Sequence, residues 1–92
     1  MLKFSLANNK AGATIIKIHH DFGDFKFYLV PDENSNKSFS WHSEPNITDT
    51  QAGDYIATEA AKAVAAFAKR PTEKMSFQEM VACLQNAQRL EQ

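Results

Sequence analysis

Cysteine is nearly absent from this sequence, and long apolar runs are absent altogether. Cys83 is the single cysteine, so the chain cannot form an internal disulfide, which favours a reducing, intracellular compartment. No stretch of apolar residues is long enough to span a bilayer, and no basic-then-apolar leader with a cleavage site is evident. From these absences we expect a soluble protein that works inside the cell without a membrane partner.

A strong excess of charge is also missing. Ten Lys and Arg residues stand against eleven Asp and Glu residues, which gives a formal net charge of −1. Neither a generally basic nucleic-acid binder nor a highly acidic DNA mimic has so balanced a charge, although local patches can still matter. With 92 residues, 43% of them hydrophobic, the chain suits one folded domain over 1–92 rather than disorder.

Catalytic and metal-binding motifs are missing as well. Asp21-Phe22-Gly23 spells the metal-binding tripeptide of protein kinases, but no phosphate loop or catalytic loop accompanies it, so we interpret it as a turn. His19 and His20 are neighbours on an expected strand and point to opposite faces, and no Cys-x-x-Cys or His-x-x-x-His spacing supports a metal site. We therefore expect no enzymatic activity, no metal and no cofactor.

The spacing of apolar and polar residues does change at Pro45. Before it, apolar and polar residues alternate in short segments separated by turn residues, which is typical of half-buried strands. The connections are too short for the crossover that parallel neighbours need. Residues 1–44 are therefore predicted to form a three- or four-stranded antiparallel meander.

Two amphipathic helices are predicted after Pro45, over 47–70 and 76–90. Thr48-x-x-Gln51 and Ser76-x-x-Glu79 are capping boxes that would begin them. The first helix carries an apolar stripe expected to face the sheet, and its members are Ala52, Ile56, Ala60, Ala63, Val64 and Phe67. Further alanines widen this arc and raise the alternative of a dimer surface, and these are Ala57, Ala61, Ala65 and Ala66. Together the patterns predict an α+β fold with both helices packed on one face of the sheet.

Strand alternation sorts the side chains of the expected sheet onto two faces. The aromatic residues expected beneath the helices are Phe4, Phe25, Phe27, Phe39 and Trp41. The opposite face is then basic with an aromatic centre, and its residues are Lys3, Lys17, Lys26, His19, His42, Tyr28 and Ile15. Such a face could follow a phosphate backbone, stack a base, or dock on an acidic protein, where Tyr is a favoured anchor. A plain solvated face, with lysines for solubility, is the remaining interpretation.

An acidic, amide-rich loop follows the third expected strand. Asp32, Glu33, Asn34 and Asn36 form its tip, and loops held by a rigid sheet often carry recognition residues. The same residue types are common in ordinary turns, so both interpretations stay open. The candidate binding set therefore joins the basic face to this loop, as Lys3, Lys17, His19, Lys26, Tyr28, Asp32, Glu33 and Asn34.

The segment Asp21–Tyr28 (DFGDFKFY), in a compact chain with a small expected sheet, two helices and no enzyme motif, resembles a stretch found among phage-encoded type I-F anti-CRISPR proteins. The resemblance implies a non-enzymatic inhibitor in the host cytoplasm that binds the subunits of the crRNA-guided surveillance complex and prevents target DNA from engaging. It carries over no residue roles, because that group shares no functional motif.

The basic face bears on how such an inhibitor would act. It departs from the acidic DNA mimics among these proteins and favours steric occlusion, with contact to the guide RNA through Lys17 and Lys26. The alternative is a small nucleic-acid-binding or regulatory module that uses the same lysines. Binding dominated by phosphate contacts would weaken steeply with added salt, whereas a mixed protein interface would weaken modestly.

Overall fold

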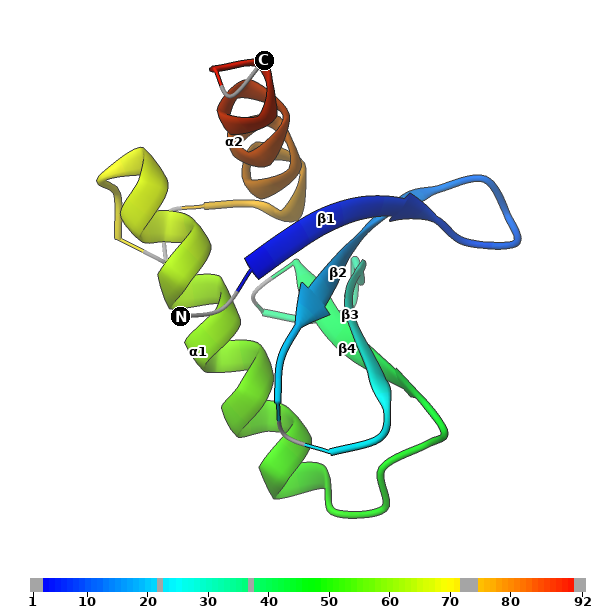
Figure 1. Ribbon diagram of the computed structural model, residues 1–92. Helices are drawn as coiled ribbons and strands as arrows, with labels where there is room; N and C mark the ends of the chain where they lie inside the picture. The colour runs from blue at the N-terminus through cyan, green and yellow to red at the C-terminus, as the bar shows by residue number, and fades with distance from the viewer. Residues whose placement is uncertain (1–2, 22, 37, 72–74, 91–92) are drawn as a thin grey trace.

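The computed structural model describes residues 3–21, 23–36, 38–71 and 75–90. Four strands are followed by two helices along the chain (Figure 1), namely β1 Lys3–Asn8, β2 Thr14–His19, β3 Lys26–Pro31, β4 Phe39–Glu44, α1 Thr50–Ala68 and α2 Phe77–Leu90. The predicted α+β fold, an antiparallel sheet followed by two helices, is confirmed. Position 22, within the turn expected at Asp21–Gly23, lies outside the described residues.

The sheet is a meander in which each strand pairs with the next in the order β1-β2-β3-β4, and every pairing is antiparallel. Ile16 lies opposite Leu29, and Leu29 lies opposite Trp41, so residues line up in rows that cross the sheet. Because successive side chains on a strand point to opposite faces, each row belongs to a single face. The fourth strand continues past Trp41 and ends at Glu44, the last residue of the region predicted to form the sheet.

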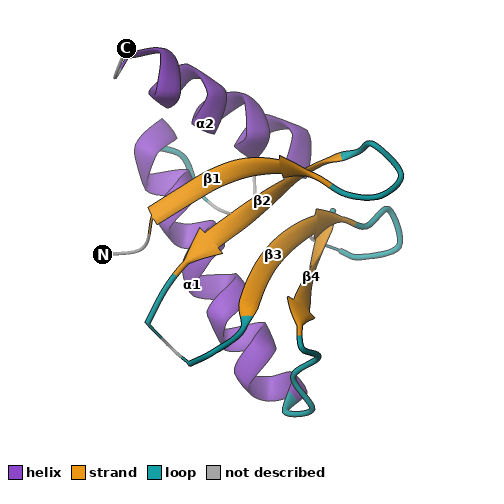
Figure 2. Ribbon diagram, turned by 45° about the vertical axis from the view of Figure 1, so that its right-hand side comes forward, coloured by secondary structure: helices purple, strands orange, loops and turns teal. Residues whose placement is uncertain are grey.

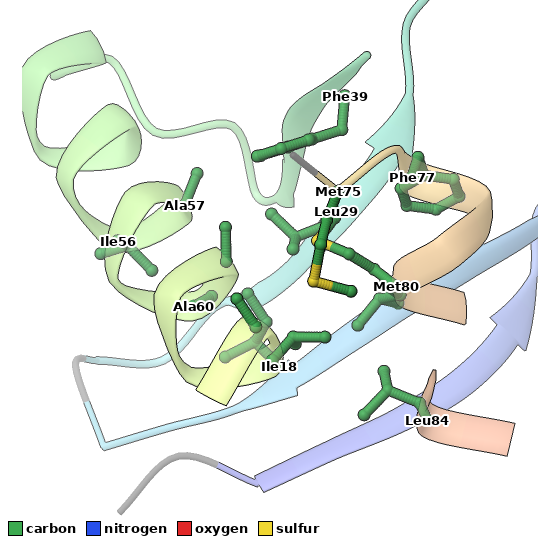
Figure 3. Packing of buried hydrophobic residues seen from close by; sticks show 14 of the residues in the cluster. Ile18, Leu29, Phe39, Ile56, Ala57, Ala60, Met75, Phe77, Met80 and Leu84 are labelled. Atoms are coloured by element: carbon green, nitrogen blue, oxygen red, sulfur yellow. The ribbon is translucent and has the colours of Figure 1, made fainter. Parts of the chain in front are cut away.

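Both helices pack on one face of the sheet, and in Figure 2 the strands lie in front of them. This inner face is closely packed, with Phe27 and Leu29 at 0% exposure and Ile18 at 2%. Figure 3 shows Ala60 of α1 and Met80 of α2 converging on this layer, and both of these residues are fully buried. Removal of this apolar surface from water is the main favourable term in folding.

The aromatic residues predicted for the inner face all belong to this core or pack against it. Phe27 and Phe39 are buried. Phe4, Phe25 and Trp41 are partly buried and pack against the same cluster. The alternation of the strands therefore identified the inner face correctly.

Trp41 fixes the first turns of α1 against the sheet. Its ring stacks on Phe27, with the ring centroids 5.5 Å apart and the planes 16° from parallel. Its Nε1–H donates a hydrogen bond to the Asp54 carboxylate at 2.8 Å. A Cβ atom at Gly53 would lie 2.1 Å from Cζ2 of Trp41, so the helix approaches the indole more closely than any larger residue allows. This close approach explains a glycine inside a helix, where glycine normally costs about 1 kcal/mol relative to alanine.

The predicted capping box at Thr48 is wrong, and α1 is shorter than the expected 47–70. Asp49 is the N-cap residue, and its carboxylate accepts a hydrogen bond from the Ala52 amide at 3.1 Å. Ile47 is held by the sheet instead, because its amide donates to the Ser43 hydroxyl at 2.9 Å. The helix can therefore begin only after the chain has left this contact with β4.

The buried face of α1 is broad and consists largely of alanine, and its members are Gly53, Ile56, Ala57, Ala60, Ala61, Val64 and Ala65. Ala57, Ala61 and Ala65 are therefore buried in the core and are not available for a dimer surface. The prediction that Phe67 is buried is also wrong, since it is 59% exposed. Phe67 lies in the last turn of α1 and lines an open hollow beside α2, and the described residues that line this hollow include none from the sheet.

The capping box predicted at the start of α2 is confirmed. The Ser76 hydroxyl accepts a hydrogen bond from the Glu79 amide at 3.2 Å, and the Ser76 amide donates to the Glu79 carboxylate at 3.5 Å. The Arg70 guanidinium also donates to Glu79, which links the end of α1 to the start of α2. This hydrogen bond from Arg70, aided by the Ser76 amide, holds the pKa of Glu79 below its ordinary value. Met75 and Met80, on either side of the box, are both buried.

Candidate interface on the outer sheet face

The face of the sheet away from the helices, here called the outer face, is the candidate binding surface. The strand register arranges its residues in rows that cross the sheet from β1 to β4 and lie about 7 Å apart. The aromatic row is Ser5, Lys17, Tyr28 and His42, and each of its neighbours is paired directly. The basic row joins the pairs Lys3–His19 and Lys26–Glu44, and the apolar row joins the pairs Ala7–Ile15 and Val30–Ser40, where the β2–β3 register is continued by one residue at either end. The basic and aromatic rows together hold every strand residue of the predicted binding set.

Tyr28 stands at the centre of the aromatic row. It lies directly opposite Lys17 of β2 on one side and opposite His42 of β4 on the other. The rings of Tyr28 and His42 are 24° from parallel, with their centroids 6.2 Å apart. Nearby, the Ser5 hydroxyl and Nε2 of His19 are 2.9 Å apart. The outer face thus places an ammonium group and two aromatic rings side by side, with a second histidine in the next row.

Lysine side chains give the outer face its positive charge. Within the described part of the chain, Lys3, Lys17 and Lys26 form no ion pair and no side-chain hydrogen bond. Glu44 is the carboxylate that belongs to the strand residues of this face, and its Oε1 lies 3.4 Å from Nε2 of His42. The three ammonium groups are therefore available to an anionic partner.

The apolar row corrects one sequence expectation. Ile15 does belong to the outer face, opposite Ala7, but it is only 6% exposed. It is also separate from the cluster of residues packed between the sheet and the helices. Ile15 therefore offers no exposed contact to a partner.

The loop between β3 and β4 does not join the basic and aromatic rows. The Asp32 carboxylate accepts a hydrogen bond from the Asn34 amide at 3.0 Å, and the Asp32 amide donates to the Ser38 carbonyl at 3.0 Å. These are the bonds of a local turn. Asp32 follows Pro31 at the end of β3 opposite to Lys26, roughly 17–20 Å along the strand direction. The predicted set therefore divides, because Asp32, Glu33 and Asn34 belong to the loop between β3 and β4. Figure 2 shows this loop at one end of the sheet.

Two residues next to the site were not in the predicted set. His42 pairs its ring with Tyr28, and Glu44 lies opposite Lys26. Alternation had already placed His42 on the outer face, and the same alternation continues through Ser43 to Glu44 at the end of β4. Extending the fourth strand to its last residue would have added Glu44 to the outer face, where His42 was already expected.

Two hollows in the described surface lie outside the basic and aromatic rows. One, of about 510 Å³, lies between the last turn of α1 and α2 and includes Phe67 and Cys83 in its lining. The other, of about 360 Å³, lies beside β4 and is lined in part by Trp41 and Ala57. Neither includes a residue of the predicted binding set. No group of three or more His, Cys, Asp or Glu side chains gathers as metal ligands within the described residues.

Comparison with known proteins finds no matching family model, no matching curated protein and no matching solved structure. In the part of the chain that the structure describes, neither helix has the length and apolar character needed to cross a membrane. Function must therefore be inferred from the surface of this protein itself.

Proposed function

We propose that this protein is a non-enzymatic inhibitor that binds the crRNA-guided surveillance complex of a type I-F CRISPR system in the host cytoplasm and blocks target DNA recognition. One observation supports a binding function above the others. Lys3, Lys17 and Lys26 share the outer face and have no anionic partner within the described residues. The class of partner rests on the resemblance of the segment Asp21–Tyr28 to a stretch of an anti-CRISPR protein.

The chemistry of the outer face favours occlusion as the mode of action. A ribonucleoprotein presents RNA phosphates beside protein, and ammonium groups bind such a surface with release of its counterions. Charged groups at the margin of an interface also speed the encounter of the partners. DNA mimicry would need the opposite charge, because the lysines of this face outnumber its Glu44 carboxylate. The bound protein would instead cover the surface that target DNA has to reach.

A second candidate is a small nucleic-acid-binding module that acts without a protein partner. The near-parallel rings of Tyr28 and His42 beside Lys17 favour it, because aromatic and cationic side chains together bind unpaired bases. Salt separates the two functions. Binding dominated by phosphates falls steeply between about 50 and 200 mM salt, whereas a mixed protein interface weakens far less.

Reversal of charge on the outer face tests the proposal. The double variant Lys17→Glu with Lys26→Glu should lose capture of the surveillance complex in a pulldown and should leave the Tm nearly unchanged, because neither side chain is in the core. A matched control is Lys10→Glu with Lys62→Glu, which changes the charge equally at a loop and on α1. The control should capture the complex normally.

Two outcomes would contradict the proposal in different ways. Normal capture by the Lys17→Glu and Lys26→Glu variant would exclude the outer face as the interface. The inhibitor function itself would be excluded if the unmodified protein captured no surveillance complex. It would also be excluded if target DNA binding by the complex did not return once the protein was removed. Mass spectrometry of proteins captured from a host lysate then identifies the partner.

A further inference from the structure

The aromatic row contains two aromatic rings as well as a charged lysine, and the rings bear on which ligand the outer face can bind. Tyr28 lies directly between Lys17 and His42 in the sheet register. The Tyr28 and His42 rings are close to parallel, and the side chain of His42 is 54% exposed. A pair of rings on a sheet face, partly open to solvent, is a surface on which another flat ring can stack.

Cationic groups flank these rings on two sides. Lys17 lies next to Tyr28 in the same row, and Lys26 precedes it by two residues on β3, so Lys26 shares its face. Lys3 and His19 extend the positive end of the face in the basic row. A phosphodiester chain that runs from the basic row to the aromatic row would meet the ammonium groups of Lys26 and Lys17 next to the ring pair. A purely electrostatic surface for an acidic protein needs no such ring pair beside its lysines.

The form of nucleic acid follows from the shape of the face. In a duplex the ring faces of the bases are covered by their neighbours, and only base edges are open in the grooves. The basic and aromatic rows of the outer face belong to a four-stranded sheet, whereas a major groove admits one helix or a two-stranded ribbon. Unpaired bases can splay from the backbone and stack on aromatic side chains.

We infer that the outer face binds single-stranded nucleic acid, with one base stacked on the Tyr28–His42 ring pair and the adjoining phosphates held by Lys17 and Lys26. This inference rests on the proposed function and specifies what the outer face contacts, an unpaired stretch of RNA or DNA in the partner. Base identity is not selected by stacking, because every base has a ring face.

Fluorescence anisotropy with labelled oligonucleotides tests the inference. The probes are a single strand of about twelve nucleotides, within usual site sizes, an abasic strand of equal length, and a duplex. We expect the single strand to bind at least about tenfold more tightly than the abasic strand, as stacking of a base predicts. Tyr28→Ala should remove this preference, and Tyr28→Phe should keep it. Lys17→Gln should weaken both strands alike and lower the salt slope by about one.

The outcomes separate failure of this inference from failure of the proposed function. Equal binding of the abasic and base-bearing strands would overturn the stacked base. A different outcome would be that no oligonucleotide binds while the Lys17→Glu and Lys26→Glu variant still loses capture of the complex. The outer face would then contact an acidic protein surface, so this inference would be overturned and the inhibitor proposal would stand. Normal capture by that double variant would overturn the role of the outer face in both. Circular dichroism of each variant confirms that it is folded.

Discussion

Phe27 and Tyr28 are neighbours in β3, yet they belong to two different parts of the protein. Phe27 is fully buried between the sheet and the helices, whereas Tyr28 is half-buried on the outer face among lysines and histidines. The side chains of the inner face pack against both helices, so they determine whether the chain folds. The outer face has no covering element among the described residues, so its side chains can carry recognition at little cost in stability.

The largest expected effect is a difference between substitutions at these two positions. Phe27→Ala should lower the free energy of unfolding by about 3–5 kcal/mol, because it leaves a cavity in a fully buried layer. Tyr28→Ala should lower it by no more than about 1 kcal/mol. Urea denaturation of both variants measures the difference. Similar losses at the two positions would mean that the faces are not energetically distinct.

A second, smaller effect is expected where α1 touches Trp41. Gly53→Ala would stabilise an isolated helix by about 1 kcal/mol, but here the added methyl group would overlap the indole. We expect a net loss of about 1–3 kcal/mol, typical of an overpacked core. Chemical denaturation gives the value, and a double-mutant cycle with Trp41→Leu isolates the clash, since the loss should shrink when the ring is gone. A stabilised Gly53→Ala variant would show that α1 is not held this closely.

The smallest effect is expected at the exposed junction of the helices. The folded state lowers the pKa of Glu79, mainly through Arg70, so the ionised carboxylate stabilises the fold at pH above its unfolded value. That contribution is lost as the pH falls through the folded-state pKa. Glu79→Gln should therefore lower the Tm slightly at neutral pH, and the difference from the unmodified protein should vanish in acid.

Thermal unfolding of both proteins from about pH 7 to about pH 3 measures this dependence. Glu59→Gln is the control for loss of an exposed glutamate on a helix, because Glu59 pairs with Lys62 on α1 and caps no helix. A Tm difference that stays constant over the whole range would show that the ionised Glu79 carboxylate does not stabilise the junction.

The helices show why some local sequence signals are sufficient to predict the structure and others are not. Ser76 and Glu79 had no competing cap nearby, and the box forms as predicted. Thr48 and Asp49 are both good caps, and the choice between them depends on a contact from Ile47 to Ser43 in β4, which local pattern does not contain. Periodicity indicated the side of α1 on which Phe67 lies. It did not show that the packed layer between helix and sheet ends before Phe67, which is exposed.

The candidate site, like the helices, was predicted only in part from the sequence. Alternation alone placed Lys17, Lys26 and Tyr28 on one face, which the register confirms. The neighbours of each residue across the strands were not predictable, because they depend on how far one strand slides along the next. The pairing of Tyr28 with His42 is therefore a product of the fold. Whether the site binds a surveillance complex remains a prediction.

The alternation of buried and outward residues along β2 and β3 has an evolutionary consequence. New specificities can arise on the outer face by exchange of one side chain at a time, since the backbone beneath is already held in place before any partner arrives. Insertion or deletion of a single codon within these strands has a different result, because it would turn the lysines inward and the phenylalanines outward. Lineages of this protein should therefore diverge by substitution in the strands and tolerate changes of length in the hairpin loops.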